Sequence, residues 1–480
     1  MKSLLRFFFL WLPLCLSAQK PIVEISNPVK LSNKANKFRV IGRNSDGIAV
    51  RLYGALDMIN VYNEQMQLAA AKTIDFKNED GMLQYVMLNK SGAVIFYLSQ
   101  DKKYSVLLAQ PVNSKYIEVG KPLVIDTIYD KKDLVASNLR FKSAVDQSHV
   151  MIYYPFFTGN KITSIQFICI DHTLQLVYNK TIPVNRDESE LEESKTLIDN
   201  DGNAFIIVKP QKVAVGDIFD VLRIAVSGDF TTYRISTLKP LFGEPSFEID
   251  NKNGNLVMCG FYNNTTTGED VANGFLYTSY NPASGATVKT SYTLFSKEFM
   301  TALTGRAATE TGKLYTFIIR KVILRNDGGA IIIAESLIKD TREVPINIGM
   351  QPGFTNYHTS IMYQFNDIIA FSMNATGEVE WNSVLHKKQA SEDDNGAYSS
   401  FLIANEKDKL HFLFLDDIST SGELNQYVLT SDGKSKREPV LNMEEKDVML
   451  LPKLGKQVSP NQVVIPSYKN GALRLTKITF

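Results

Sequence analysis

The feature that most constrains the fold of this chain is a recurring polar corner followed by a run of β-forming residues. Asp46-Gly47 precedes such a run at 48–53, and Asp201-Gly202 precedes another at 204–208. Asn, Asp and Gly adopt the positive-φ conformations that tight β-turns require, and β-branched and aromatic residues are favoured in strands. Because this combination of a polar corner and a β-forming run recurs along the whole chain, the sequence predicts an almost entirely β-structured protein.

The spacing of the corners favours one β architecture. They fall at positions 47, 92, 146, 202, 254, 328, 408 and 462, which gives steps of 45, 54, 56, 52, 74, 80 and 54 residues. A four-stranded propeller blade occupies about 40 to 50 residues, and more where its loops are long. We interpret the two long steps as blades with insertions, one of which contains a helix-like patch at 295–300. A two-sheet sandwich array and a β-helix are the alternatives, and the spacing favours the propeller over both.

One unit can be followed strand by strand. Three runs, at 256–262, 274–280 and 286–292, are separated by turns and read as a meander of antiparallel hairpins. The last unit, which opens near position 462, is too short for a blade. In a closed propeller such a remnant completes the blade begun by the N-terminal strands and hides two sheet edges. The sequence therefore predicts an all-β fold, a β-propeller of about seven four-stranded blades closed by pairing of its N- and C-terminal strands.

The first 18 residues have the three-part plan of a secretory signal peptide. Lys2 and Arg6 form a positive region, 7–16 is an apolar run, and Ser17 and Ala18 are small. Ten apolar residues are too few for a helix that crosses a hydrocarbon core of about 30 Å. We therefore expect 1–18 to be a signal peptide and the protein to be exported.

The remaining chain, 19–480, is expected to form a single propeller-like domain. A buried N-terminal helix and a lipoprotein cysteine at Cys15 are the alternatives for the leader. No later stretch reaches 18 apolar residues, so no transmembrane segment is predicted. The formal charge is +1, which becomes about −1 without the leader's two basic residues, and this argues against a nucleic-acid partner.

No catalytic, cofactor-binding or metal-binding residue is predicted. The five histidines lack the spacing of a zinc site, and the nucleophile-elbow and phosphate-loop patterns are missing. Asp393-Asp394 and Asp416-Asp417 suggest the paired carboxylates of a glycosidase, but neighbours on a strand point to opposite faces. The segment 199–203 begins like a calcium loop and lacks its distant Glu, so a hairpin turn is the favoured interpretation. Cys169 and Cys259 lie in apolar runs and are expected to be buried free thiols rather than a disulfide.

The second half of the chain carries a family resemblance. The segments that carry this resemblance include Gly260-Phe261-Tyr262, Gly328-Gly329-Ala330, 377–381 and 431–434. From about Gly260 onward the sequence resembles a group of exported, largely uncharacterised propeller-like proteins of Bacteroidota. The resemblance implies a fold and a compartment. Some proteins of that kind are envelope partners of outer-membrane machinery, including a protein-secretion translocon. The resemblance assigns no functional residue in this chain.

Two functional hypotheses follow. The first is a non-catalytic exported scaffold or interaction protein, periplasmic or associated with the outer membrane or cell surface, whose loop face docks on an outer-membrane complex. The alternative is a glycan-binding or carbohydrate-active propeller, which predicts a concave mouth with aromatic side chains and two convergent carboxylates. Loops vary on a propeller while the blades keep its shape, so binding is expected at loops, but the sequence does not identify which.

Overall fold

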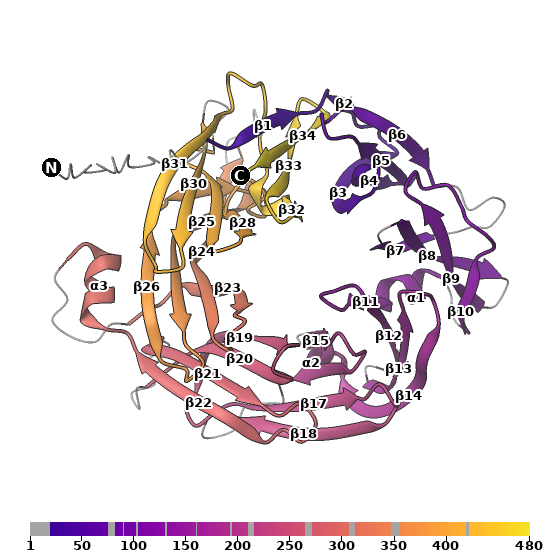
Figure 1. The fold of residues 1–480 in the computed structure, drawn as a ribbon, viewed down its shortest axis with the longest axis horizontal. Helices are drawn as coiled ribbons and strands as arrows, with labels where there is room; N and C mark the ends of the chain where they lie inside the picture. Colours follow the sequence, from indigo (N-terminus) through magenta and orange to yellow (C-terminus); the bar gives the residue numbers. More distant parts are fainter. Residues whose placement is uncertain are drawn as a thin grey trace, which may run out of the picture.

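The chain forms a ring of eight antiparallel sheets in the computed structural model (Figure 1). The structure describes residues 20–74, 82–89, 91–101, 104–129, 132–159, 161–192, 194–209, 216–264, 271–306, 313–346, 356–418 and 422–480. The expected signal peptide lies outside these residues. We number the sheets as blades 1 to 8, and the first strand of each blade lies nearest the centre of the ring.

Blades 1 to 4 are each one continuous stretch of chain. Blade 1 contains β3 (Ala35–Asn44), β4 (Gly47–Gly54), β5 (Met58–Tyr62) and β6 (Leu68–Thr73). Blade 2 contains β7 (Met82–Asn89), β8 (Gly92–Asp101), β9 (Tyr104–Asn113) and β10 (Leu123–Ile128). Blade 3 contains β11 (Arg140–Ser143), β12 (His149–Thr158), β13 (Lys161–Asp171) and β14 (Leu176–Asp187). Blade 4 contains β15 (Lys195–Ile198), β16 (Ala204–Val208), β17 (Ile218–Ile224) and β18 (Phe230–Ser236).

Blades 5 to 7 continue the pattern. Blade 5 contains β19 (Leu241–Asp250), β20 (Asn255–Tyr262), β21 (Gly274–Tyr280) and β22 (Thr287–Leu294). Blade 6 contains β23 (Phe317–Leu324), β24 (Ala330–Ile346), β25 (Asn356–Met373), β26 (Val379–Leu385) and the short β27 (Gln389–Glu392), which pairs with β25. Blade 7 contains β28 (Phe401–Glu406), β29 (Lys409–Leu415), β30 (Glu423–Thr430) and β31 (Ser435–Asn442).

Blade 8 closes the ring from the two ends of the chain. Its C-terminal strands are β32 (Lys456–Ser459), β33 (Gln462–Lys469) and β34 (Ala472–Thr479), and both β1 (Ile22–Ile25) and β2 (Val29–Lys30) pair with β34. The predicted closure is therefore confirmed. Blades 1 to 7 are continuous meanders, in line with the expected number of about seven. The C-terminal strands form a further sheet with β1 and β2, which precede blade 1 and supply the outer edge of that sheet. The ring therefore holds eight blades.

Hydrophobic contacts between neighbouring blades hold the ring together. The strand β16 is buried along its whole length: Phe205 and Ile207 pack against blade 5, while Ile206 and Val208 pack against blade 3. Side chains alternate across a strand, so a strand between two other sheets must be apolar on both faces, which explains the unbroken runs in the sequence. Eight such clusters form among the described residues, one at each joint between blades.

The meander gives the ring two different faces. Turns that join the first strand to the second, and the third to the fourth, lie on one face, which we call the turn face. The connections between the second and third strands, and between blades, lie on the other, which we call the crossover face. All eight corners predicted from the sequence are first-to-second-strand connections on the turn face.

Short helices occur in the connections between blades. The helices α1 (Lys132–Asn138) and α2 (Glu188–Glu192) flank blade 3, and α3 (Lys297–Thr304) lies outside the ring between blades 5 and 6 (Figure 1). The helix-like patch predicted at 295–300 is confirmed by α3. A 3-10 turn, η1 (Pro452–Leu454), precedes β32. The long step before position 408 reflects the extended β24–β25 hairpin and β27.

Candidate functional site

The paired acids that suggested a glycosidase are used in local structure. Asp393 Oδ1 accepts a hydrogen bond from the Ile361 backbone N–H at 2.8 Å, and Asp394 Oδ1 accepts one from the Gly396 N–H at 2.8 Å. Asp416 forms an ion pair with Arg437 and accepts a hydrogen bond from an amide side chain. Asp393, Asp394 and Asp416 therefore stabilise turns and strand ends.

The other sequence candidates also have structural roles. The segment 199–203 is the β15–β16 turn, as expected, because Asp199 Oδ1 accepts the N–H groups of Asp201 and Asn203. Cys169 and Cys259 are free and buried, and burial raises the pKa of the Cys169 thiol to about 12, which leaves it a poor nucleophile. Within the described ranges, no group of three or more His, Cys, Asp and Glu side chains could hold a metal ion.

An exposed aromatic groove lies on the crossover face, over blades 2 to 4. It consists of two adjoining cavities of about 380 and 270 Å³, whose linings share Asn138, Pro155 and Phe157. Phe157 and its neighbour Phe156, at the tip of the β12–β13 hairpin, are 37% and 39% exposed, and Tyr129 is 83% exposed. Such large apolar side chains would normally be buried, so their position at a cavity indicates a binding surface.

The walls of the aromatic groove are held by aromatic contacts and hydrogen bonds. The Tyr154 ring meets that of Phe156 edge-on, with centroids 5.4 Å apart, and Tyr154 Oη donates to Asp126 Oδ2 at 2.6 Å. Burial and this carboxylate both raise the pKa of Tyr154, so the phenol stays protonated. Arg140 is held at the end of α1 by donating to the Ser137 carbonyl at 2.5 Å. The groove is therefore preformed by fixed side chains.

The polar groups of the aromatic groove suit recognition rather than reaction. The amide of Asn138 and the exposed carboxylate of Glu188 line the larger cavity beside the aromatic rings. Glu188 is the only acid that lines either cavity among the described residues. General acid–base hydrolysis of a glycoside needs two carboxyl groups about 5 to 10 Å apart. The described groove therefore offers flat rings and hydrogen-bonding groups, without the paired carboxylates that the second hypothesis predicts.

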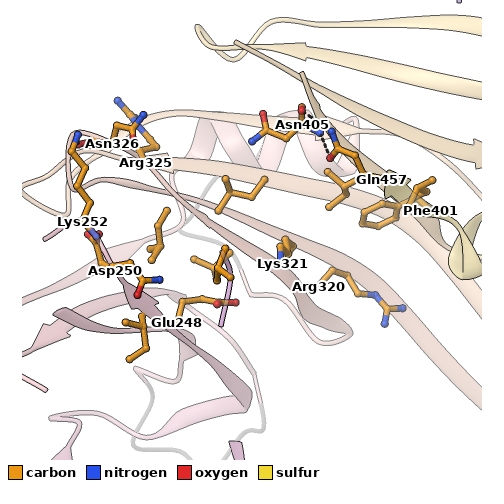
Figure 2. A pocket seen from close by; sticks show the side chains of 18 of the residues that line it. Glu248, Asp250, Lys252, Arg320, Lys321, Arg325, Asn326, Phe401, Asn405 and Gln457 are labelled. Atoms are coloured by element: carbon orange, nitrogen blue, oxygen red, sulfur yellow. Dashed lines mark hydrogen bonds between the residues drawn. The ribbon is translucent and has the colours of Figure 1, made fainter. Parts of the chain in front are cut away.

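A separate cavity, of about 710 Å³, opens on the inner strands of the ring, and we call it the channel cavity. Its walls come from β19, β23 and β28, with contributions from turns of neighbouring blades. Figure 2 shows Glu248 of β19 and Lys321 of β23 entering it from neighbouring strands. Asn405 and Gln457 are joined across the blade 7–blade 8 joint by two hydrogen bonds of 3.0 and 2.9 Å.

The charges of the channel cavity are unbalanced. Five basic and two acidic side chains line it: Lys252, Arg320, Lys321, Arg325 and Lys453, against Glu248 and Asp250. Burial raises the pKa of Glu248, although Lys321 and Lys142 oppose the change. Burial also lowers the pKa of Lys453, which the nearby Arg320 reinforces.

Sequence reasoning found neither the aromatic groove nor the channel cavity. Phe156 and Phe157 follow Tyr153 and Tyr154 with only Pro155 between them, so periodicity and composition do not separate exposed from buried rings. The usable signal was Pro155, which cannot donate to a strand ladder, followed by two aromatics beside Gly159 at a hairpin tip. The channel cavity joins residues from several blades, and no local pattern marks it.

Comparison with known proteins assigns this chain to no family. No family model and no curated protein matches this sequence. The ring of eight sheets, closed by its two chain ends, decides the architecture. This chain is a β-propeller.

Solved structures that match this propeller share little sequence with it. The WD40 domain of SCAP from fission yeast is 11% identical over 96% of this chain and 98% of that chain, with a TM-score of 0.43. A protein of unknown function from Bacteroides caccae is 11% identical over 73% of this chain and 93% of that chain (TM-score 0.28). Puromycin hydrolase is 10% identical over 92% of this chain and 61% of that chain (TM-score 0.37). In the described part of this propeller, no helix is long and apolar enough to span a membrane.

Proposed function

We propose that this propeller is a non-catalytic exported interaction protein, a periplasmic partner of an outer-membrane complex such as a protein-secretion translocon. The signal-peptide pattern at 1–18 supports export. The resemblance to exported propeller-like proteins of Bacteroidota supports the envelope setting. The absence of a recognisable catalytic pattern in the sequence favours binding over chemistry.

The observation that carries this proposal is the aromatic groove. Aromatic residues dominate the energetics of protein interfaces because they bury a large area at a small cost in conformational entropy. Tyr129, Phe156 and Phe157 project from the crossover face, where connecting segments can vary without disturbing the blades. We infer that these three side chains dock the propeller on its partner.

Co-purification from the native envelope tests the proposal. The tagged protein is compared with the double variant Phe156→Ser/Phe157→Ser and with Tyr129→Ser, and recovery of integral outer-membrane proteins is quantified. Loss of an aromatic anchor commonly costs about 2 kcal/mol or more, so recovery is expected to fall about thirtyfold at limiting concentration. Tyr315→Ser is the matched control, because Tyr315 is also an exposed tyrosine, 62% accessible, in a connection between blades.

Two results would count against this function. Recovery of the wild-type protein as a lone monomer from gently solubilised envelopes would contradict the existence of a stable partner. Equal losses in Tyr129→Ser and Tyr315→Ser would mean that the aromatic groove is not the docking surface. Unchanged thermal unfolding of each variant establishes that a loss of binding is not a loss of fold.

A glycan-binding propeller is the second candidate function, and the lining of the aromatic groove favours it. Tyr129 and Phe157 offer flat faces on which sugar rings stack, and Asn138 and Glu188 offer hydrogen-bonding groups. A glycan array tests it, with Phe157→Ser expected to abolish any signal and Tyr315→Ser to preserve it. A blank array together with a blank hydrolase panel would remove this candidate.

A further inference from the structure

The hairpin of β24 and β25 is longer than the first strand of the blade that carries it. β23 pairs with β24 only as far as Ser336. Within the described residues, the last backbone hydrogen bond on that side runs from the Leu337 N–H to the Thr316 carbonyl at 2.9 Å. From 338 to 346, the described strand that pairs with β24 is β25 alone. One edge of β24 is therefore free there, and an unpaired strand edge is a template for another strand.

The free edge presents its backbone groups at alternate residues. In an antiparallel pair, each strand turns its N–H and C=O groups alternately toward its partner and away from it. The Leu337 N–H faces away from β25, and the register continues without a shift from there to the end of β24. The residues that follow with the same orientation are Lys339, Thr341 and Glu343. Pro345 would come next and has no N–H, so the free backbone groups are centred on Thr341.

The charges along this edge mirror one another about the same residue. Asp340 and Arg342 flank Thr341, and their exposed ion pair spans 2.8 Å. Lys339 and Glu343 lie one residue farther out, and both are exposed. Each base therefore lies as far from Thr341 on one side as an acid does on the other.

The apolar residues at the two ends of the edge follow the same symmetry. Ile338 and Val344 each lie three residues from Thr341, and they are 37% and 42% exposed. Alternate residues of a strand share a face, so both lie on the face that carries Asp340 and Arg342. The edge thus combines free backbone groups, opposite charges and exposed apolar side chains in a pattern that is complementary to itself.

We propose that two copies of this propeller associate through the free edge of β24, antiparallel, with the two-fold axis at Thr341. Thr341 of one copy then faces Thr341 of the other, and Lys339 faces Glu343 on either side. The outward N–H of each of these residues donates to a carbonyl of the second copy, so the two hairpins form one continuous sheet. Asp340 faces Arg342 and Ile338 faces Val344, and cross-strand pairs of these kinds stabilise a sheet.

The charges make this alignment specific. With the axis moved to Asp340, that carboxylate would face its own copy, and with the axis at Arg342 two guanidinium groups would meet. Like charges directly opposite each other destabilise a pair of strands. Charged residues commonly protect exposed edges from pairing, and here they permit one alignment while opposing its neighbours.

Sedimentation velocity of the mature protein over a concentration series tests the association. The wild-type protein is expected to form dimers that weaken as the salt concentration rises. Lys339→Glu and Glu343→Lys each bring like charges together on both sides of the axis, and each is expected to weaken dimerisation about tenfold or more. Lys72→Glu is the matched control, because it makes the same change on the exposed outer strand β6 and should leave the dimer unchanged.

A mixture of the two variants makes the test independent of damage to the fold. Lys339→Glu has acids at both positions and Glu343→Lys has bases at both, so the two should form a mixed dimer although each dimerises poorly alone. The double variant Lys339→Glu/Glu343→Lys restores the complementarity and should recover the dimer. Thr341→Pro removes an N–H that β25 does not use, so it should abolish the dimer and leave thermal unfolding unchanged.

Three results would overturn the proposal. The first is a wild-type protein that stays monomeric over the whole concentration series, which would leave the edge to a strand of a different protein. The second is a mixture of the two charge variants without a mixed dimer, and the third is equal weakening in Lys72→Glu and Lys339→Glu. The aromatic groove lies over other blades, so Phe156→Ser/Phe157→Ser should leave the dimer intact, and the docking function proposed above can fail without this association failing.

Discussion

The Nζ atom of Lys477 lies 2.6 Å from Oε2 of Glu24, and this ion pair joins the last strand of the chain to the first. The two residues face each other directly in the β1–β34 register. Lys477 is almost completely buried and also donates a hydrogen bond to the Glu64 carbonyl of blade 1. One side chain therefore connects the N-terminal strand, the C-terminal strand and the first blade.

Replacing Lys477 is predicted to weaken ring closure. Lys477→Ala leaves Glu24 without its cation, whereas Glu64 keeps its ion pair with Arg43, and we expect a loss of about 1–3 kcal/mol in the free energy of unfolding, less than for a fully buried pair because Glu24 is one-third exposed. Denaturant titration measures it. Lys469→Ala, which breaks an exposed pair with Asp447, should cost less than about 1 kcal/mol. Equal losses in the two variants would show that closure does not depend on Lys477.

A second prediction concerns the buried pair of Glu335 and Lys387 in blade 6. Their side chains are completely buried, with Lys387 Nζ 2.7 Å from Glu335 Oε1. The ammonium also donates to the Phe365 carbonyl at 3.0 Å and to Gln389 Oε1 at 2.9 Å. Burial lowers the pKa of Lys387, and Glu335 opposes that change. Glu335→Gln removes the counter-charge, and we expect a loss of about 3–5 kcal/mol in stability.

A double-mutant cycle separates the ion pair from the packing. Lys387→Met fills a similar volume without a charge, so in the presence of Glu335→Gln it should cost less than in the wild-type protein. We expect a coupling energy of about 0.5–3 kcal/mol from denaturant titrations of the four proteins. Simple additivity of the two single changes would show that the charges do not interact.

The sequence was sufficient to predict the ring and insufficient to predict the contacts and cavities that depend on packing between blades. Corners such as Asp46-Gly47 and Asp201-Gly202 mark each blade because turn chemistry is local, and buried runs such as 204–208 mark strands packed on both faces. Closure could be predicted because a remnant of two or three strands needs a partner. Glu335 and Lys387 are far apart in sequence, and only the β24–β25 hairpin and its return strand bring them together.

The same limit explains why the binding surfaces were not predicted. The walls of the channel cavity come from β19, β23 and β28, which are far apart in the sequence and belong to three different blades. Phe157 differs from the buried Phe167 of the next strand by its place at a hairpin tip. These relationships depend on packing between blades, which has no local signature.

A third prediction concerns a glycine that packs against a tryptophan. Gly433 has a φ of +80°, and a Cβ added there would lie 2.7 Å from the Trp381 ring, whose Nε1 donates to the Ser431 carbonyl at 2.8 Å. Gly433→Ala is expected to cost about 1–2 kcal/mol for the left-handed backbone and about 1–3 kcal/mol more for displacing the ring. Gly471→Ala is the control, because its φ is +75° and its added Cβ meets nothing within 4 Å.

Fluorescence reports the displacement directly. The chain has two tryptophans, and the other, Trp11, lies in the expected signal peptide. The emission of mature Gly433→Ala should therefore shift with the environment of Trp381, whereas that of Gly471→Ala should not. Identical spectra and identical stabilities for the two variants would contradict the contact.

The last prediction is a pH dependence at the joint of blades 3 and 4. Asp220 of β17 is paired with Arg186 of β14 and lies 2.8 Å from Nε of Arg234 of β18. Burial raises the pKa of Asp220, but the two guanidinium groups outweigh burial and hold it below its usual value. A carboxyl whose folded-state pKa is lowered stabilises the protein above its unfolded pKa of about 3.9, and that stabilisation is lost as the pH falls through the folded-state value.

Asp220→Asn should therefore be less stable than the wild-type protein at pH 7, and the difference should shrink as the pH is lowered below about 4. Denaturant titrations at pH 7, 5, 4 and 3 measure both effects. Asp432→Asn is the control: Lys434 and Thr430 lower the pKa of Asp432 to about 2, but this carboxylate is exposed, so water and salt screen its interactions and its loss should have a much smaller effect at pH 7. A constant difference between wild type and Asp220→Asn across the series would mean that Asp220 keeps its charge throughout, or that packing alone accounts for its contribution.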